Sequence, residues 1–185
     1  MRVITGIAKG KRLDTLEGMD VRPTTDRVKE GMFSSIQFDL ENTLVLDLFA
    51  GSGQLGIEAL SRGARSAVFV DNSKKSLEVV KANLEKTNLT DKAMIVNMNS
   101  LDFLRLTDKK FDFIFLDPPY NKGILLEVLP LLKERLNSYG KIICEHEKNL
   151  DLPKKVGDLR LKKSYKYGKI NVSMYLFDRF DREDE

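Results

Sequence analysis

Short apolar runs alternate with amphipathic segments from residue 43 onward. This alternation predicts a parallel sheet covered by helices. We expect strands at residues 43–48, 66–70, 93–98, 111–116 and 141–145. Helices are expected at 54–62, 74–88, 101–106 and 123–136, where apolar residues recur at helical spacing. Ser73 is expected to cap the second of these helices at its N-terminus.

The two ends of the chain follow other patterns. Extended runs at 159–167 and 170–177 flank Gly168-Lys169, which predicts an antiparallel hairpin after the parallel strands. In the first 40 residues, two short runs flank Ala8-Lys9-Gly10 as in a small basic hairpin, and a helix is expected at 26–38. We therefore divide the chain into an N-terminal hairpin and helix (1–40) and a main domain (41–185).

Composition narrows the class of protein. With 185 residues, 42% hydrophobic and 32% charged, the chain fits a soluble globular domain with a sizeable core, and no apolar run is long enough to cross a bilayer. A single cysteine, Cys144, excludes an internal disulfide and fits a reducing cytoplasm. The only histidine, His146, has no partners at metal-ligand spacing, so we predict no metal site. No coiled-coil pattern or large apolar patch is evident, and we expect a monomer.

Positive charge is unevenly distributed, although the net charge is only +3. Residues 1–12 contain four basic residues and no acid, and residues 154–169 are also strongly basic, whereas the C-terminal tail is acidic. This distribution favours a polyanionic partner, and it is equally compatible with solvated faces.

The segment after the first strand is rich in glycine. Gly51, Gly53 and Gly56 match the pattern G-x-G-x-x-G, and Asp71 ends the next strand. Between a strand and a helix, this pattern is compatible with a dinucleotide whose pyrophosphate lies at the helix N-terminus. A tight turn alone would also explain the glycines.

Asp47 favours a different ligand, because a carboxylate before the glycine turn repels a pyrophosphate but attracts an ammonium group. S-adenosylmethionine has an ammonium, a sulfonium and no phosphate. The chain also lacks room for the substrate domain that most dinucleotide dehydrogenases carry. We therefore expect S-adenosylmethionine here, with Asp71 on the ribose and residues 99–102 beside the adenine. The predicted contacts are Asp47, Phe49, Ala50, Gly51, Ser52, Gly53, Asp71, Asn72, Ser100, Leu101 and Asp117.

Asp117-Pro118-Pro119-Tyr120 follows the fourth strand. Neither proline can donate to a sheet, so the chain must turn away at the strand's carboxyl end, where open α/β sheets bind ligands. A carboxylate, a bare carbonyl and an aromatic ring at one point suit the amino group of a planar base. A strand-terminating turn with a solvated aspartate is the alternative.

The order of these motifs resembles the class I methyltransferase fold, a Rossmann-like α/β sheet that is mostly parallel and ends in an antiparallel hairpin. Five blocks are similar to the RsmD family of bacterial methyltransferases, which act on guanine N2 in small-subunit (16S) ribosomal RNA. They are MRVITG (1–6), KGKRL (9–13), RPTTDRVKE (22–30), LFAGSG (48–53) and GIEALSRGA (56–64). Asp71 replaces the more usual glutamate, Tyr120 stands where phenylalanine is also common, and Asn99-Ser100 replaces an acid expected near the adenine.

The resemblance implies that Asp117, Pro118, Pro119 and Tyr120 form the catalytic group, and that the N-terminal part binds RNA. The residues expected at the RNA are Arg2, Lys9, Lys11, Arg12, Arg22, Thr24 and Arg27. Three questions stay open. Asp-Pro-Pro-Tyr suits an adenine N6 as well as a guanine N2, a non-catalytic RNA-binding module could keep the fold, and the lysines at 162, 163 and 166 suit either RNA or a solvated sheet edge.

Overall fold

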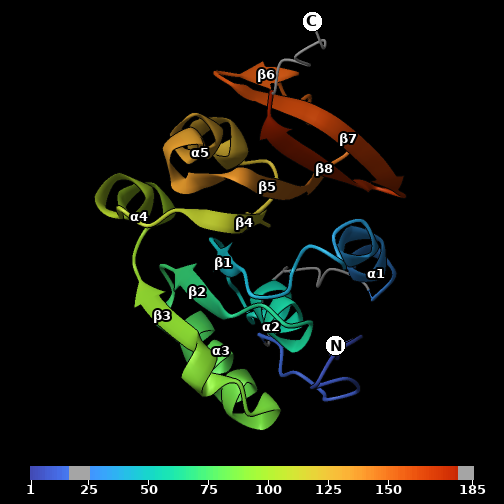
Figure 1. Ribbon diagram of the computed structural model, residues 1–185, viewed down its shortest axis with the longest axis vertical. Coiled ribbons are helices and arrows are strands. Elements are labelled where there is room, and N and C mark those ends of the chain that lie inside the picture. The colour runs from blue at the N-terminus through green and yellow to red at the C-terminus, as the bar shows by residue number, and fades with distance from the viewer. Residues whose placement is uncertain (17–25, 179–185) are drawn as a thin grey trace, which may run out of the picture.

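The sheet is mostly parallel and ends in antiparallel strands, as predicted. The computed structural model describes residues 1–16 and 26–178, and in these residues one eight-stranded sheet has the order β3-β2-β1-β4-β5-β8-β7-β6 (Figure 1). Its parallel part consists of β1 (Leu44–Asp47), β2 (Ser66–Asp71), β3 (Ala93–Asn97), β4 (Phe111–Leu116) and β5 (Leu136–Glu147). The antiparallel part adds β6 (Lys155–Val156), β7 (Leu159–Tyr167) and β8 (Ile170–Phe177).

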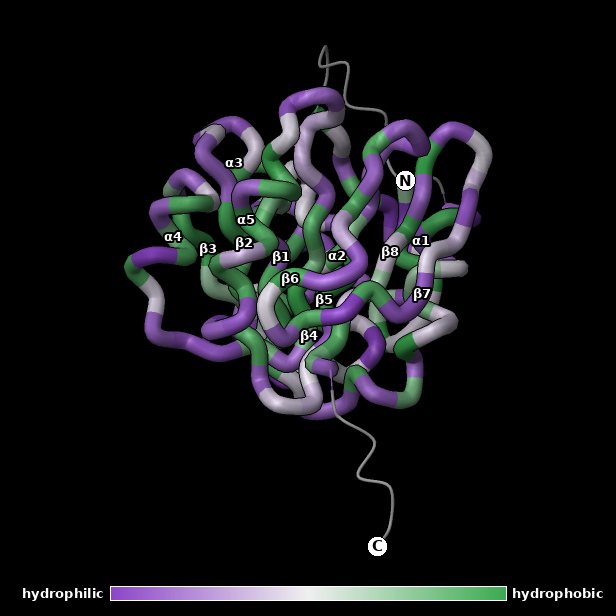
Figure 2. Tube along the Cα trace, turned by 90° about the horizontal axis from the view of Figure 1, so that it is seen from above, coloured by the Kyte–Doolittle hydropathy of each residue, from purple (hydrophilic) through white to green (hydrophobic). Residues whose placement is uncertain are grey.

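Helices cover both faces of the sheet and divide the core in two. One cluster of buried side chains lies under α1 (Asp26–Ser34), α2 (Gln54–Ser61) and α3 (Lys74–Thr87), and the other under α4 (Ser100–Leu106) and α5 (Ile124–Leu132). Short 3-10 turns, η1 (Thr90–Lys92) and η2 (Lys133–Arg135), lead into β3 and β5. Hydrophobic segments concentrate along the central strands, and the outer loops are hydrophilic (Figure 2). No helix of the described chain is long and apolar enough to span a membrane.

The strand order changes direction between β1 and β4. From β1 the chain proceeds outward through β2 and β3 and then returns to the other side of β1 as β4. In sheets of this type, ligands bind where the order reverses, at the edge where the parallel strands end; we call this the carboxyl edge. Asp47 ends β1 at this edge and pairs in register with Phe115 of β4, so Asp117 follows two residues beyond that pairing.

Two predicted helices are too long. The segment expected to be helical to Leu136 ends at Leu132, and Leu136 instead begins β5 by pairing with Phe111. Leu136 is buried in the same core as the leucines of α5. The spacing of leucines in the sequence therefore does not show where the helix ends and the strand begins. The helix expected to reach Phe38 ends at Ser34, whose hydroxyl bonds back to the Glu30 carbonyl, a contact that competes with the helical backbone hydrogen bonds. The cap predicted at Ser73 is confirmed, since its side chain accepts from the Ser76 N–H.

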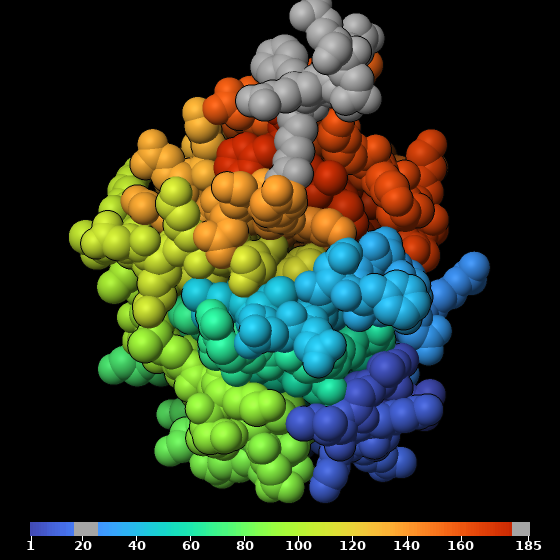
Figure 3. Space-filling view, in the orientation of Figure 1, coloured from blue at the N-terminus to red at the C-terminus, as the bar shows by residue number. Residues whose placement is uncertain are grey.

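The N-terminal segment (1–16) lies beside α2 (Figure 1) and forms part of the outer surface (Figure 3). Arg2 and Arg12 form an isolated antiparallel bridge within it. Its turn lies at the C-terminal end of α2, because the Ile7 N–H donates to the Ser61 carbonyl at 2.8 Å. Its other end reaches the glycine loop, where the Met1 sulfur accepts from the Ser52 hydroxyl at 3.8 Å. The segment therefore runs from the carboxyl edge to the opposite edge of the sheet.

Glu58 on α2 attaches this segment to the domain. Its two carboxylate oxygens accept the backbone N–H groups of Ile4 and Thr5 at 2.8 and 3.0 Å. Lys29 of α1 lies 3.5 Å from the same carboxylate, and its ammonium donates to the Arg2 carbonyl. Lys29 and Glu58 are both fully buried, and burial lowers the pKa of Lys29 while Glu58 opposes that shift.

We expect Glu58→Ala to lower the free energy of unfolding by about 3–5 kcal/mol, because it leaves a buried ammonium without its counter-ion and two backbone donors without their acceptor. Chemical denaturation of the purified variant measures this. Glu127→Ala, at an exposed position of α5, is the control. Equal stability of the two variants would contradict the role of Glu58.

Candidate active site

Asp47 lies buried beneath the glycine loop, with 1% of its surface exposed. Its Oδ2 accepts the Gly56 N–H at 2.9 Å, so the carboxylate is fixed against the first turn of α2. Burial, together with the nearby charge of Asp71, raises the pKa of Asp47 to about 7. A cation bound beside Asp47 would favour its ionised form.

The glycines of the loop meet two separate requirements. Gly53 begins α2 with a φ of +79°, in the left-handed region that disfavours side chains. Gly56 packs against Phe69 of β2, where a Cβ would lie only 2.3 Å from the ring. The turn is thus tight and close to β2, and the backbone N–H groups of the loop lie at the carboxyl edge.

Asp71 connects the loop to the end of β2. Its Oδ2 accepts the Gly51 N–H at 2.9 Å and its Oδ1 accepts the Ser73 N–H at 2.8 Å. Each carboxylate oxygen can accept a second hydrogen bond, so two acceptor positions fit a pair of ribose hydroxyls. Asn97 and Met98, at the end of β3, both donate to the Asp71 carbonyl, which brings the start of α4 beside the loop.

The residues predicted near an adenine lie at that helix start. Ser100 and Leu101 form the first turn of α4, and Asn99 caps it by accepting the Leu101 N–H at 2.9 Å. The side-chain oxygen of Asn99 is therefore already used in capping α4. Asn72, which follows Asp71, is exposed.

The tetrapeptide after β4 is held by the end of β5. The Tyr120 hydroxyl donates to the Glu145 carboxylate at 2.6 Å, and the Asn121 N–H donates to that of Glu147 at 3.0 Å. Burial, followed by the charge of Glu145, raises the pKa of Tyr120, so its phenol is a donor at neutral pH. Asp117 is close enough to contribute to the same shift.

Two carboxylates thus lie at the carboxyl edge of adjacent strands: Asp47 ends β1 beside the glycine loop, and Asp117 follows β4 near the Tyr120 ring. Pro118 is buried in the turn and Pro119 is exposed. The described residues contain no group of three histidine, cysteine, aspartate or glutamate side chains placed to hold a metal ion.

The described residues among those predicted to contact RNA are spread along the N-terminal segment and the start of α1. Arg27, on the first turn of α1, is exposed close to the carboxyl edge, whereas Lys9 lies in the turn near the far end of α2. Arg2 forms an ion pair with Asp26 at 3.3 Å, and Lys11 and Arg12 are exposed along the segment. Arg22 and Thr24 fall outside the described residues.

Sequence reasoning missed three residues that hold the site together. Asn83 of α3 is fully buried and joins residue 14 to the glycine loop: it accepts from the Asp14 N–H at 2.7 Å and donates to the Ser52 carbonyl at 2.9 Å. Glu145 and Glu147 hold the Asp117–Tyr120 turn. The available signal was a polar residue within an apolar pattern, since Asn83 interrupts the buried stripe of α3 and Glu145 follows Ile143-Cys144.

The sheet order and the two motifs at its carboxyl edge define a class I S-adenosylmethionine-dependent methyltransferase. A family model described as "Conserved hypothetical protein 95" matches residues 1–176, and the chain belongs to this family, the RsmD family identified from the sequence motifs.

Two curated relatives are similar over most of their length. One is YlbH of Bacillus subtilis (strain 168), named provisionally as an rRNA methyltransferase, with 42% identity over 95% of this chain and 98% of the relative. The other, from Haemophilus influenzae, is named "Ribosomal RNA small subunit methyltransferase D", with 37% identity over 82% of this chain and 81% of the relative. Among solved structures, yhhF from Escherichia coli has a TM-score of 0.85 and 32% identity, covering 96% of this chain and 97% of its own.

We expect the affinity for S-adenosylmethionine to rise with pH through about 7, because a carboxyl whose pKa is raised to about 7 is neutral below that pH and attracts a cation only above it. The dissociation constant should increase towards tenfold per pH unit below about pH 7. Calorimetry between about pH 5.5 and about pH 7.5 measures this.

Asp47→Asn is the matched control, because its amide oxygen still accepts the Gly56 N–H while the charge is absent. This variant should bind weakly with no pH dependence in the same range. A wild-type affinity that stays constant across the range would contradict the role of Asp47.

We expect Tyr120→Phe to lower kcat about tenfold, because the ring loses its charge-assisted hydrogen bond to Glu145. Glu145→Gln combined with Tyr120→Phe should lower kcat no further than the more severe single change, since both act through one contact. Tyr139→Phe, at a position 80% exposed, is the control. Full activity of Tyr120→Phe would show that the hydrogen bond does not position the ring.

Proposed function

We propose that this protein transfers a methyl group from S-adenosylmethionine to the exocyclic N2 of one guanine in small-subunit (16S) ribosomal RNA. The observation that carries the proposal is the turn Asp117–Tyr120 beside the glycine loop at the reversal of strand order. Relatives named rRNA methyltransferases, similar over nearly the whole chain, support the RNA as substrate.

The residues around the loop fit the cofactor. Asp47 offers a buried carboxylate to its ammonium group, and Asp71 has acceptor positions for its ribose hydroxyls. Gly53, with its left-handed φ, makes the loop turn tightly, and without side chains at Gly51 and Gly53 the backbone could approach the methionine part closely. Bound there, S-adenosylmethionine supplies an electrophilic methyl group on a sulfonium.

The acceptor half of the site prepares the base. The lone pair of an exocyclic guanine amino group is delocalised into the ring, which makes this nitrogen a weak nucleophile. The Asp117 carboxylate and the Pro118 carbonyl would accept its two hydrogens, favour the pyramidal form and direct the lone pair towards the methyl group. Tyr120 would stack on the base, which must be unpaired or flipped out to enter.

Alignment and electrostatic preorganisation supply most of the rate in this mechanism. The hydrogen bonds of Glu145 and Glu147 to the turn fix its position before substrate arrives, and this reduces the reorganisation that catalysis requires. Asp117 or water removes the proton that the amino group loses. The protein would act as a monomer in the cytoplasm, on free rRNA or on the small subunit.

The test is the identity of the methylated nucleoside. Purified protein is incubated with labelled S-adenosylmethionine and unmodified small subunits, and the RNA is then digested to nucleosides. We expect the label in N2-methylguanosine. Label in N6-methyladenosine would instead establish the adenine alternative, since the Asp-Pro-Pro-Tyr turn suits either amino group. An absence of both labelled nucleosides, together with no binding of the cofactor, would favour a non-catalytic RNA-binding module.

Asp117→Ala should lower turnover by about two to three orders of magnitude, because it removes the acceptor that orients the amino group. Its affinity for S-adenosylhomocysteine should stay within a few-fold of wild type, since Asp117 addresses mainly the base. Asp71→Ala gives the opposite pattern, a raised dissociation constant for the same ligand. Single-turnover kinetics and calorimetry separate the two effects. A large loss of cofactor binding in Asp117→Ala would mean that its role is misassigned.

A further inference from the structure

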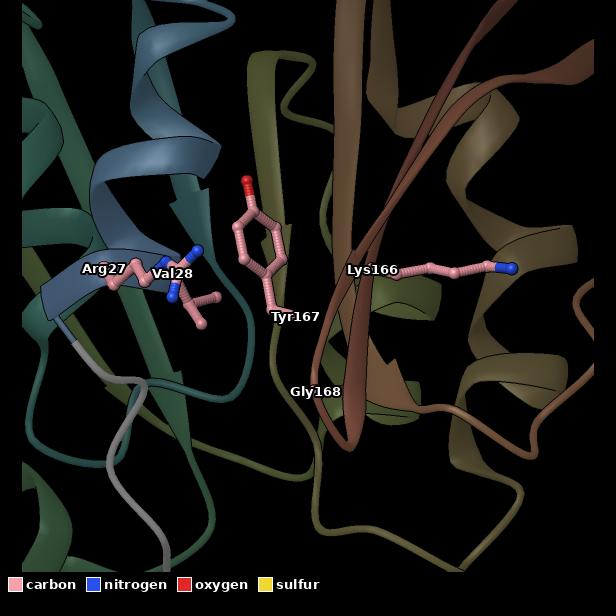
Figure 4. Close-up of a pocket in the computed structure, with 5 residues that line it drawn as sticks. All are labelled: Arg27, Val28, Lys166, Tyr167 and Gly168. Carbon is pink, nitrogen blue, oxygen red and sulfur yellow. The ribbon is translucent and has the colours of Figure 1, made fainter.

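A hollow of about 290 Å³ lies between α1 and the turn of the β7–β8 hairpin (Figure 4). It is lined by Arg27 and Val28 from α1 and by Lys166, Tyr167 and Gly168 from the hairpin. In Figure 4 Tyr167 points towards α1, whereas the Lys166 side chain extends from the other side of the hairpin. The Tyr167 hydroxyl reaches α1 at Gly31, where a Cβ would lie 1.9 Å from it. The glycine therefore permits the ring to lie against the helix.

This hollow lies at the same carboxyl edge as the proposed base pocket. β8 runs antiparallel to β5 with Ile170 opposite Glu147, and the Lys148 N–H donates to the Lys169 carbonyl at 3.0 Å. Glu147 in turn accepts the Asn121 N–H, next to Tyr120. The hairpin turn is therefore directly linked to the turn that follows β4.

Positive charge at this hollow is not neutralised by other described residues. Arg27 lines the hollow, and Lys169 follows the lining residue Gly168 in the hairpin turn. Both are exposed, and within residues 1–16 and 26–178 neither forms an ion pair. Asp26, next to Arg27, is paired with Arg2. The far end of the hairpin differs, because Arg160 and Lys162 both lie within ion-pair distance of Asp178.

We propose that this hollow binds the backbone of the RNA substrate beside the target guanine, with Arg27 in the hollow and Lys169 in the adjoining turn on phosphate oxygens. The inference rests on the proposed function. It adds to the base pocket a second surface that contacts RNA, formed by the β7–β8 hairpin together with α1. Its size, at the low end of ligand pockets, suits one nucleotide unit. A base that leaves its stack to reach Tyr120 carries its flanking phosphates with it, and these must pass a neighbouring surface. The guanidinium group of arginine and the ammonium group of lysine form charge-assisted hydrogen bonds with phosphate oxygens.

This assignment separates the lysines of the hairpin into two groups. Lys162, paired with Asp178, belongs to the solvated end of β7. Lys166 and Lys169 belong to the turn at the carboxyl edge. The charge of the hairpin therefore serves RNA binding at one end only.

The test compares the same charge reversal at the two ends of the antiparallel strands. Lys169→Glu and Arg27→Glu alter the hollow. Lys155→Glu alters exposed β6, which pairs with Arg160 about 20 Å along β7 from the turn, and serves as the matched control. Filter binding to unmodified 16S rRNA transcript over a range of KCl concentrations gives affinity and salt dependence. Methyl transfer to unmodified small subunits gives KM and kcat.

We expect each variant in the hollow to weaken RNA binding about tenfold and to reduce the salt slope by about one, the signature of a lost phosphate contact. KM should rise more than kcat falls, and the affinity for S-adenosylhomocysteine should stay within about twofold, which also establishes that the variants fold. Lys155→Glu should change RNA affinity less than about twofold. Equal weakening by all three variants, or unchanged binding by the two in the hollow, would overturn the proposal.

The outcome is distinguishable from failure of the proposed function. If the wild-type protein forms no N2-methylguanosine but the variants in the hollow still selectively weaken RNA binding, the methylation proposal fails and the RNA surface stands. If methylation occurs and the three variants behave alike, the surface is wrong and the function stands.

Discussion

The pairing of β1 with β4 is the constraint on which the site depends. These strands lie side by side although β2, β3 and three helices separate them in the chain, and their register places Asp47 opposite Phe115. The Leu48 N–H donates to the Phe115 carbonyl at 3.2 Å, which continues the pairing past the last residue of β1. Because both strands end here, the glycine loop and the Asp117–Tyr120 turn leave the sheet next to each other. A shift of this register would move the glycine loop and the Asp117–Tyr120 turn apart.

Buried polar contacts then fix the parts that the sheet does not hold. Asn83 fixes residue 14 and the glycine loop on α3, and Glu145 fixes the Tyr120 ring from β5. Glu58 does the same for the N-terminal segment, with Lys29 as its buried counter-ion. Removing one partner of such a contact leaves a desolvated polar group, which is why the structure specifies each position closely. The glycine loop, the Asp117–Tyr120 turn and the N-terminal segment are thus each secured to a rigid element.

The periodicity of apolar residues identified those helices and strands whose pattern of buried positions fits only one type of secondary structure. The strands at 111–116, 159–167 and 170–177 begin and end as predicted, since each is bounded by residues that change the pattern abruptly. The end of α5 could not be located in this way, because Leu136 is buried in the same core whether it belongs to a helix or to a strand. Short β6 was not predicted, since its two residues carry no periodic pattern.

Within the site, the sequence placed Asp47, Asp71 and Asp117 at the carboxyl edge, because each ends or directly follows an apolar strand. It did not identify Asn83, Glu145 or Glu147, whose contacts join positions that local patterns leave unrelated. Arg27 was predicted as an RNA contact, but its neighbour Tyr167 was not, since only the folded hairpin brings β7 to α1.

A structure of the protein bound to S-adenosylhomocysteine tests the central claim most directly, because it locates the donor relative to both turns. We expect ribose hydroxyls within hydrogen-bonding distance of the Asp71 carboxylate, the ammonium on the side of Asp47, and the sulfur facing the Asp117–Tyr120 turn. A ligand whose ribose lies away from Asp71, or whose sulfur faces away from Asp117, would contradict this expectation.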